Sequence, residues 1–538
     1  MSAPIGEAEA ASRLQAGEAA LAAGRAPEAE QIARAVLAAR RRDAGAHYLL
    51  GRALAALGRF ADAETAFRAL DRLRPGVAEV ATQLALCALQ AGDGARAVRL
   101  LRAAARKHPG DFNIAYNLAG LLHDEGELDA AIEAYERALA IDPAHLFARR
   151  GLAFTLSERG NDVRAGEIAD GVLGDAPHDP VAIAVRAACA LRAGKPDEAR
   201  ALVERHFRRE ASDPVNTALV LGRYGEALDR LGEPQRAFAA WQAGNGEMRA
   251  AFAARHEASA GAYSLAEAQR LRSVFAGRPG GAAAEPRGPA PVFLVGFQRA
   301  GTTLIEQILA AHPAVQTTGE DDSIAPLREA AGSGEDSLRA LLAADPARLT
   351  GLRRKYWKAA RPEGPPGDGR VFIDKLPLNM IWLGVIGRVF PDARILLAVR
   401  DPRDVVLSAF QQRFAMTDAN YRLLDWQETA RFYDAVMGAG MAGLAASPGP
   451  EVYEARYEAI VADWRGEARR MLDFLGLPWD EAVLDYREQA KARAITTPSA
   501  DQVRRPVYTD ALGRWKRYEF AYGPVMVDLA AWVERFGY

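Results

Sequence analysis

The stretch FLVGFQRAGTTLIEQIL, Phe293 to Leu309, places a glycine-containing loop between a strand pattern and a helix pattern. Val292 to Val295 are apolar and β-prone, and the helix pattern opens at Thr302. Gly296 and Gly301 have the spacing of a phosphate-binding loop, so backbone N–H groups and the positive helix end are predicted to face an anion. This order predicts an α/β, P-loop-like domain with a parallel sheet.

The loop lacks the lysine that reaches the outer phosphates of a nucleoside triphosphate, because Thr302 follows Gly301. Arg299 offers a charged fork instead, and Thr302 and Thr303 add hydroxyl donors. No acidic cluster is placed to hold Mg²⁺. We therefore predict that the segment of Arg299, Ala300, Gly301, Thr302 and Thr303 binds a nucleotide with a short anionic tail, without a metal.

A second strand–loop–helix pattern covers ARILLAVRDPRDVVLSAFQQ, Ala393 to Gln412. Ile395 to Val399 read as a buried strand, Arg400 lies at its carboxyl end, and Pro402 falls in the first turn of a helix. Arg400 and Ser408 are predicted to meet across the turn and hold a second anion. Two separate anion sites fit a nucleotide that is phosphorylated at two places.

The first part of the chain repeats every 34 residues. Three residue types recur in phase: proline at 75, 109, 143 and 177; glycine at 24, 58, 92, 126, 160 and 194; alanine at 29, 63, 97, 131, 165 and 199. Period and signature match the tetratricopeptide (TPR) repeat, and a weaker seventh unit contains Gly232 and Ala237. We predict an all-α TPR solenoid whose curved inner face docks a partner or substrate. The alternative is that the repeats only stabilise or dimerise the protein.

The predicted domains are a TPR array at 1–245, a connecting helix with a Gly/Pro/Ala-rich linker at 246–290, and an α/β domain at 291–538. A net charge of -2 gives no sign of nucleic-acid binding. The N-terminus lacks a signal-peptide pattern and no apolar run could span a membrane, so we expect a cytoplasmic protein. Cys87 and Cys189 are too few for a disulfide framework, and both are expected in the core.

The two anion motifs together resemble the sulfotransferase family, whose donor is 3'-phosphoadenosine 5'-phosphosulfate (PAPS). GFQRAGTTL resembles its 5'-phosphosulfate loop, and VRDPRDVVLS resembles its 3'-phosphate motif. Residues 291–520 are most similar to the tyrosylprotein sulfotransferases and to bacterial fusions of TPR repeats with a sulfotransferase. The resemblance implies sulfuryl transfer from PAPS to a hydroxyl, first of all a protein tyrosine, which leaves 3',5'-ADP.

The same resemblance implies catalytic residues. Glu320 follows Gly319 in TTGEDDSI and would be the base, with the neighbouring Asp321 and Asp322 as alternatives. Lys375 in VFIDKLPLN would stabilise the leaving phosphate.

The segment TTPSADQVRRPVY resembles the family's C-terminal nucleotide contacts. Ser499 would donate to the sulfuryl or phosphate oxygens, and Arg505 would close over the nucleotide. His312 is expected to end a helix and Trp515 to anchor the C-terminal helix. The competing hypotheses are a sulfotransferase for a carbohydrate or small-molecule hydroxyl, an ATP-dependent kinase, and a non-catalytic TPR adaptor.

Overall fold

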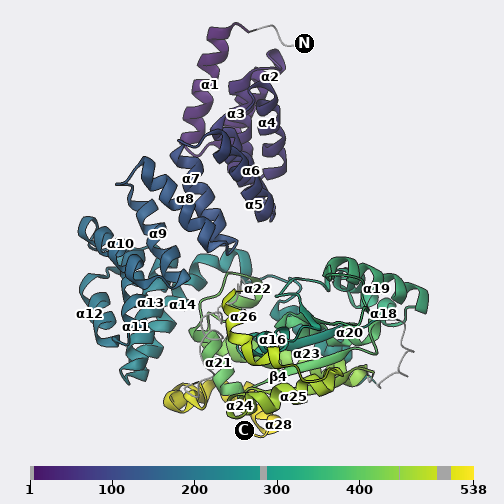
Figure 1. Cartoon of the computed structure of the whole chain (residues 1–538). Coiled ribbons are helices and arrows are strands. Elements are labelled where there is room, and N and C mark those ends of the chain that lie inside the picture. The colour runs from purple at the N-terminus through teal and green to yellow at the C-terminus, as the bar shows by residue number, and fades with distance from the viewer. Residues whose placement is uncertain (1–4, 279–287, 448, 493–510) are drawn as a thin grey trace. The chain divides into compact units, whose positions relative to one another are not determined.

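The computed structural model describes residues 5–278, 288–447, 449–492 and 511–538. The chain forms two compact units, Met1–Arg208 and Arg209–Tyr538 (Figure 1). Ser499 and Arg505 lie outside the described residues, so their predicted roles remain predictions. The predicted domain extents also remain predictions.

The first unit consists of helices that pack in consecutive pairs, one pair per repeat. In chain order they are α1 (Glu7–Ala22), α2 (Ala26–Ala39), α3 (Ala44–Ala56), α4 (Phe60–Leu73), α5 (Ala78–Gln90), α6 (Gly94–Lys107), α7 (Phe112–Asp124), α8 (Leu128–Ile141), α9 (Leu146–Arg159), α10 (Asp162–Asp175), α11 (Pro180–Arg192) and α12 (Pro196–His206).

The repeated residues explain the pairing. Gly126 turns the chain between α7 and α8 with φ +78°, a left-handed conformation that favours glycine. Ala131 is completely buried because the two helices cross there, and Tyr135 packs against the next repeat at Gly151. The predicted solenoid is thus confirmed.

The second unit is built on a parallel sheet with the strand order β2-β3-β1-β4-β5. Its strands are β1 (Val292–Gly296), β2 (Val315–Thr317), β3 (Val371–Lys375), β4 (Arg394–Val399) and β5 (Glu451–Arg456). Strand β1 is fully buried, as its apolar run predicted. From β1 the chain continues to β2 on one side of the sheet, and from β4 it continues to β5 on the other side. The strand order therefore reverses between β1 and β4. Ligands of open α/β sheets bind at the carboxyl ends of the strands at such a point.

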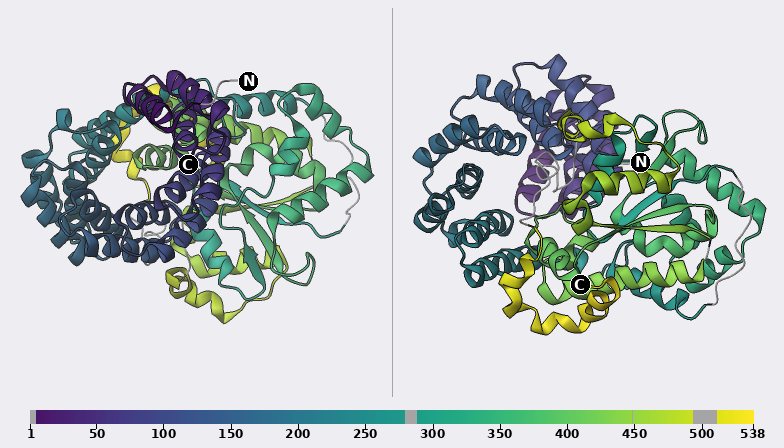
Figure 2. Two further views of the ribbon diagram at one scale, coloured as in Figure 1. Left: turned by 90° about the horizontal axis from the view of Figure 1, so that it is seen from above. Right: turned by 60° about the horizontal axis from the view of Figure 1, so that its bottom comes forward.

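Helices cover both faces of this sheet (Figure 2). The α-helices are α13 (Pro214–Arg230), α14 (Pro234–His256), α15 (Leu265–Phe275), α16 (Thr302–Ala310), α17 (Ala325–Ala331), α18 (Glu335–Leu342), α19 (Pro346–Ala360), α20 (Leu383–Val389), α21 (Pro402–Gln411), α22 (Asp418–Arg422), α23 (Trp426–Ala446), α24 (Tyr457–Ala462), α25 (Trp464–Leu475), α26 (Tyr486–Ala492) and α28 (Met526–Phe536). Short 3₁₀ helices are η1 (Arg209–Ala211), η2 (Pro377–Trp382), η3 (Glu481–Asp485), η4 (Arg514–Ala521) and η5 (Gly523–Val525).

The seventh helix pair, α13 and α14, folds with the second unit. Phe238 of α14 contacts the rings of Phe410 and Trp426 at centroid distances of 5.4 and 5.3 Å. Trp241, also on α14, lies 5.8 Å from the ring of Tyr518 in η4. The last repeat therefore contributes to the core that supports the sheet.

Candidate active site

The loop after β1 has the backbone of an anion-binding turn. Gly296 has φ +152° and lies so close to β4 that a Cβ would stand 2.7 Å from the carbonyl oxygen of Ala398. Gly301 has φ +105°, and Arg299 has φ +72°, an uncommon value for a residue with a side chain. Helix α16 begins directly after Gly301, so its first N–H groups have no partner within the helix. This is the geometry that the glycine spacing predicted.

The loop after β4 meets the loop after β1. Arg400 is only 7% exposed, and its Nη1 donates to the carbonyl of Arg299 at 3.2 Å. Its Nη2 donates to the carbonyl of Ala511 at 2.6 Å, and its guanidinium lies 4.8 Å from the ring centre of Tyr457. Within the described ranges, Nε of Arg400 is buried without a hydrogen-bond partner. This buried N–H is available to an acceptor oxygen of a ligand.

Ser408 links the two loops, and its predicted role in holding an anion with Arg400 remains a prediction. Its hydroxyl accepts a hydrogen bond from Nε of Arg299 at 3.1 Å, whereas Arg400, among the residues that the structure describes, donates to two backbone carbonyls. Ser408 lies on α21, two turns after Arg400, and contacts the β1 loop. The two predicted anion-binding segments are therefore in direct contact.

Lys375 ends β3 and is completely buried between two carboxylates. Its Nζ lies 2.6 Å from Oε1 of Glu320 and 3.1 Å from Oε2 of Glu306. The side chain of Glu320 is 35% exposed, whereas that of Glu306 is 4% exposed. Glu320 also has φ +89°, so its backbone is strained. The structure thus brings the predicted base and the predicted lysine together at the carboxyl edge of the sheet.

Asp374, which precedes Lys375, is buried in a network of neutral hydrogen-bonding groups. Tyr356 donates to Oδ2 at 2.8 Å and the amide of Asn379 donates to Oδ1 at 3.3 Å. Tyr263 in turn donates to Oδ1 of Asn379 at 2.8 Å. Burial raises the pKa of Asp374 to about 7, although the hydrogen bond from Tyr356 opposes the rise.

A carboxylate on α21 ties the C-terminal segment to this edge. Asp404 is 2% exposed and accepts backbone N–H bonds from Gly513 at 2.7 Å and from Trp515 at 2.9 Å. Burial raises its pKa. The indole ring of Trp515 lies under the guanidinium of Arg403, 3.8 Å from the ring centre. These contacts hold the segment after residue 510 beside Arg400.

His312 is a structural residue, as expected from its place after α16. Its Nδ1 accepts from the N–H of Ala314 at 3.1 Å, and its Nε2 lies 3.0 Å from the carbonyl of Pro478. Both ring nitrogens are therefore occupied in holding the end of the helix.

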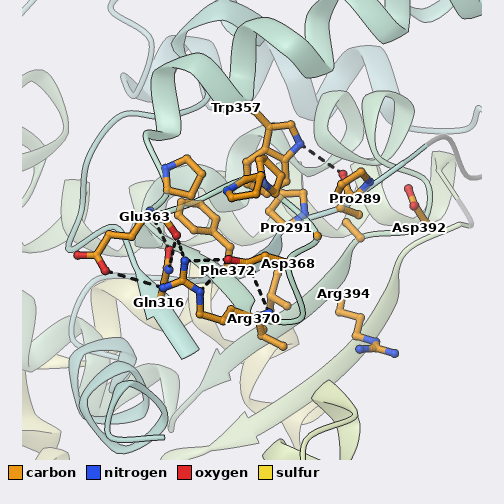
Figure 3. A pocket seen from close by; sticks show the side chains of 18 of the residues that line it. Pro289, Pro291, Gln316, Trp357, Glu363, Asp368, Arg370, Phe372, Asp392 and Arg394 are labelled. Carbon is orange, nitrogen blue, oxygen red and sulfur yellow. Dashed lines mark hydrogen bonds and ion pairs between the residues drawn. The ribbon is translucent and has the colours of Figure 1, made fainter. Parts of the chain in front are cut away.

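A pocket of about 620 Å³ opens at the opposite edge of the sheet, where the strands begin (Figure 3). Trp357 and Phe372 form part of its wall, and Arg370 is held there by Asp368. Because parallel sheets bind ligands at their carboxyl edge, we do not assign this pocket to the site around Lys375.

Comparison with known proteins agrees with both units. Residues 14–78, 82–145 and 122–189 match the Tetratricopeptide repeat, and residues 291–481 match the Sulfotransferase family. The chain joins TPR repeats to a sulfotransferase domain. The resemblance found in the sequence is confirmed.

Three curated relatives illustrate the similarity. An uncharacterized protein of Aquifex aeolicus (strain VF5) is 29% identical over 248 residues, which cover 44% of this chain and 32% of that protein. Protein-tyrosine sulfotransferase A of Caenorhabditis elegans is 27% identical over 254 residues, 42% of this chain and 60% of that protein. Protein-tyrosine sulfotransferase 2 of Gallus gallus is 29% identical over 260 residues, 44% of this chain and 66% of that protein. The chain thus spans less than two thirds of the length of these relatives.

Two residues of the sulfotransferase domain were missed in the sequence. Glu306 is the single charged side chain in the helix TTLIEQILA, and Asp374 stands beside Lys375 at the end of an apolar strand. A charged residue inside an apolar pattern is the sequence signal that indicates both residues. Such a residue is buried only where a partner group compensates its charge, so it marks a polar site in the core.

Within the described ranges, no group of three or more His, Cys, Asp or Glu side chains is arranged to hold a metal ion. None of the helices described is both long and apolar enough to cross a membrane.

Proposed function

We propose that the sulfotransferase domain transfers a sulfuryl group from PAPS to an acceptor hydroxyl, with protein tyrosine as the first candidate. The contact between Lys375 and Glu320 at the carboxyl edge of the sheet supports this best. PAPS, when bound, supplies the activated sulfuryl group. Glu320 takes the proton of the acceptor hydroxyl, and Lys375 donates to the oxygen on which negative charge develops.

The proposed donor site consists of the two loops that meet between β1 and β4. The first N–H groups of α16, with Arg299, Thr302 and Thr303, hold the phosphosulfate end. Arg400 and Ser408 hold the other phosphate. The buried, unpartnered Nε of Arg400 supports this assignment, since an acceptor oxygen would satisfy it.

Binding of the product nucleotide tests the donor site. Immobilised 3',5'-ADP should retain the protein, and Arg400→Ala should largely abolish retention. EDTA should leave sulfuryl transfer unchanged. The alternative, an ATP-dependent kinase, predicts a different result: the protein would not bind 3',5'-ADP, ATP would stabilise it, and EDTA would abolish its activity.

The role of Glu320 is tested separately. Glu320→Gln should retain 3',5'-ADP binding and lower turnover by roughly 10²- to 10⁴-fold, the usual contribution of a general base. Asp321→Asn serves as the matched control. If Glu320→Gln turns over normally and Asp321→Asn loses turnover, Asp321 is the base instead.

The TPR array is proposed to dock the acceptor protein or peptide. An aromatic patch supports this role: Phe112 and Tyr116 stack at 5.8 Å, and Phe147 is 50% exposed with the guanidinium of Arg150 at 4.7 Å. Phe147→Ala should raise KM for a protein acceptor, whereas Val163→Ala, which removes another exposed apolar side chain, should not. A KM that is equal in both variants would favour a role of the repeats in stability or in a homodimer.

The acceptor itself is found by incubating a lysate with labelled PAPS and identifying the labelled species. A labelled tyrosine supports the first candidate, whereas a labelled carbohydrate or small molecule selects the alternative. A donor-binding chain without any labelled product would be a non-catalytic adaptor. A cytoplasmic location completes the proposal.

A further inference from the structure

We propose that Glu306 is a positioning residue for the transfer reaction: it holds the ammonium of Lys375 in place and charged, so that Glu320 is free to serve the acceptor. This inference rests on the proposed function. The carboxylates of Glu306 and Glu320 share one buried ammonium, that of Lys375.

The two carboxylates are held very differently. Glu306 projects from α16, the helix that begins at the anion-binding loop, and its side chain is 4% exposed. Glu320 stands on a loop with φ +89° and its side chain is 35% exposed. A group on a rigid helix keeps its position, whereas a partly exposed loop group can exchange partners. Glu306 is therefore the permanent partner of Lys375, and Glu320 is the exchangeable one.

This division solves an electrostatic difficulty of the proposed chemistry. Lys375 is completely buried, so its charged form needs an opposite charge nearby. As the acceptor oxygen bonds to sulfur, its proton passes to Glu320, and the electron pair of the broken sulfur–oxygen bond goes to the phosphate oxygen. Glu320 is then neutral and no longer balances the ammonium. Glu306 still does, so Lys375 remains a charged donor to the departing phosphate.

Glu306→Gln keeps the shape of the side chain and removes its charge. We expect kcat with PAPS and a synthetic peptide carrying one tyrosine to fall by up to about 100-fold, as for a misplaced catalytic group. KM for the peptide and Kd for 3',5'-ADP should stay within about twofold, because the ion pair of Glu306 is with Lys375, which acts on the leaving oxygen in the proposed transfer. Glu467→Gln is the matched control, since Glu467 is 7% exposed and is bound by Tyr453 and Arg470 away from the site.

A double-mutant cycle separates positioning from a purely structural role. If Glu306 acts through Lys375, Glu306→Gln costs no further activity in a Lys375→Ala background. Additive losses, or a kcat of Glu306→Gln equal to that of the wild type, overturn the proposal. If Glu306→Gln does not fold, Glu306→Asp is measured instead; it keeps the charge with a shorter reach, and wild-type kcat in that variant also overturns it.

Failure of the proposed function is read from the wild type. A wild-type chain that binds no 3',5'-ADP, or transfers nothing to the tyrosine peptide, refutes the proposed function. The ion pair between Glu306 and Lys375 is also tested without an activity assay, by measuring the same double-mutant cycle with urea unfolding. Independent effects of Glu306→Gln and Lys375→Ala on the unfolding midpoint refute the pairing on which the inference depends.

Discussion

Asp374→Asn should change the pH dependence of stability of the second unit. Asp374 is completely buried, and its partners Tyr356 and Asn379 are neutral. Burial raises its pKa to about 7 from the ordinary value of 3.8. The native protein therefore keeps this proton up to about pH 7, whereas the unfolded chain releases it near pH 4. A carboxyl with a raised pKa stabilises the fold at low pH, and this stability is lost as the pH rises through the native pKa.

The size of the effect follows from the two pKa values. The full difference corresponds to about 4 kcal/mol, and the part lost between pH 5 and pH 8 is about 3 kcal/mol, at 1.36 kcal/mol per pH unit. An amide in place of the carboxyl cannot ionise, so Asp374→Asn removes this loss. It weakens one hydrogen bond, which costs about 1 kcal/mol at every pH. By pH 5 the wild type has already lost about 1 kcal/mol, so the variant should be about as stable as the wild type at pH 5 and about 3 kcal/mol more stable at pH 8.

Urea unfolding followed by tryptophan fluorescence measures this difference, because all 8 tryptophans lie in the second unit. The wild type, Asp374→Asn and the control Asp336→Asn are compared at pH 5 and pH 8; Asp336 is fully exposed. The control should follow the wild type. If Asp374→Asn loses as much stability as the wild type between the two pH values, the carboxyl of Asp374 is not the group whose titration changes the stability.

Two further variants test the frame of the site. Gly296→Ala should lose 3',5'-ADP binding and about 1–3 kcal/mol of stability, because its Cβ would stand 2.7 Å from the carbonyl oxygen of Ala398 at φ +152°. Gly334→Ala is the control, since Gly334 has open space around it. Equal binding of 3',5'-ADP by both variants would contradict the role of the close approach. Asp229→Asn should lower the free energy of unfolding by about 1–3 kcal/mol, measured as a lower urea midpoint. This buried carboxylate on α13 accepts from Tyr518 and pairs with Arg514 and, at 3.0 Å, with Arg517. An unchanged midpoint would mean that the last repeat is not anchored to the C-terminal segment through this group.

The sequence by itself determined the elements and their order. Repeated glycine and alanine positions specify the TPR helix pairs, because a left-handed turn and a close helix crossing each restrict which residue fits. The strand–loop–helix at Gly301 and the buried strand before Arg400 were predicted for the same reason: local patterns reflect local backbone geometry. The resemblance then indicated Glu320 and Lys375 as partners in one reaction.

Only the tertiary structure decided which side chains meet. The contact of Ser408 with Arg299, the packing of the seventh repeat into the second unit, and the carboxylate of Glu306 beside Lys375 all join residues that are far apart in sequence. No local pattern encodes such contacts, because they depend on how strands order themselves in the sheet and which helix faces cover it. The environment of the buried Lys375 side chain shows the reason. It is formed by α16, by β3 and by the loop of Glu320 together, and none of these segments determines it alone.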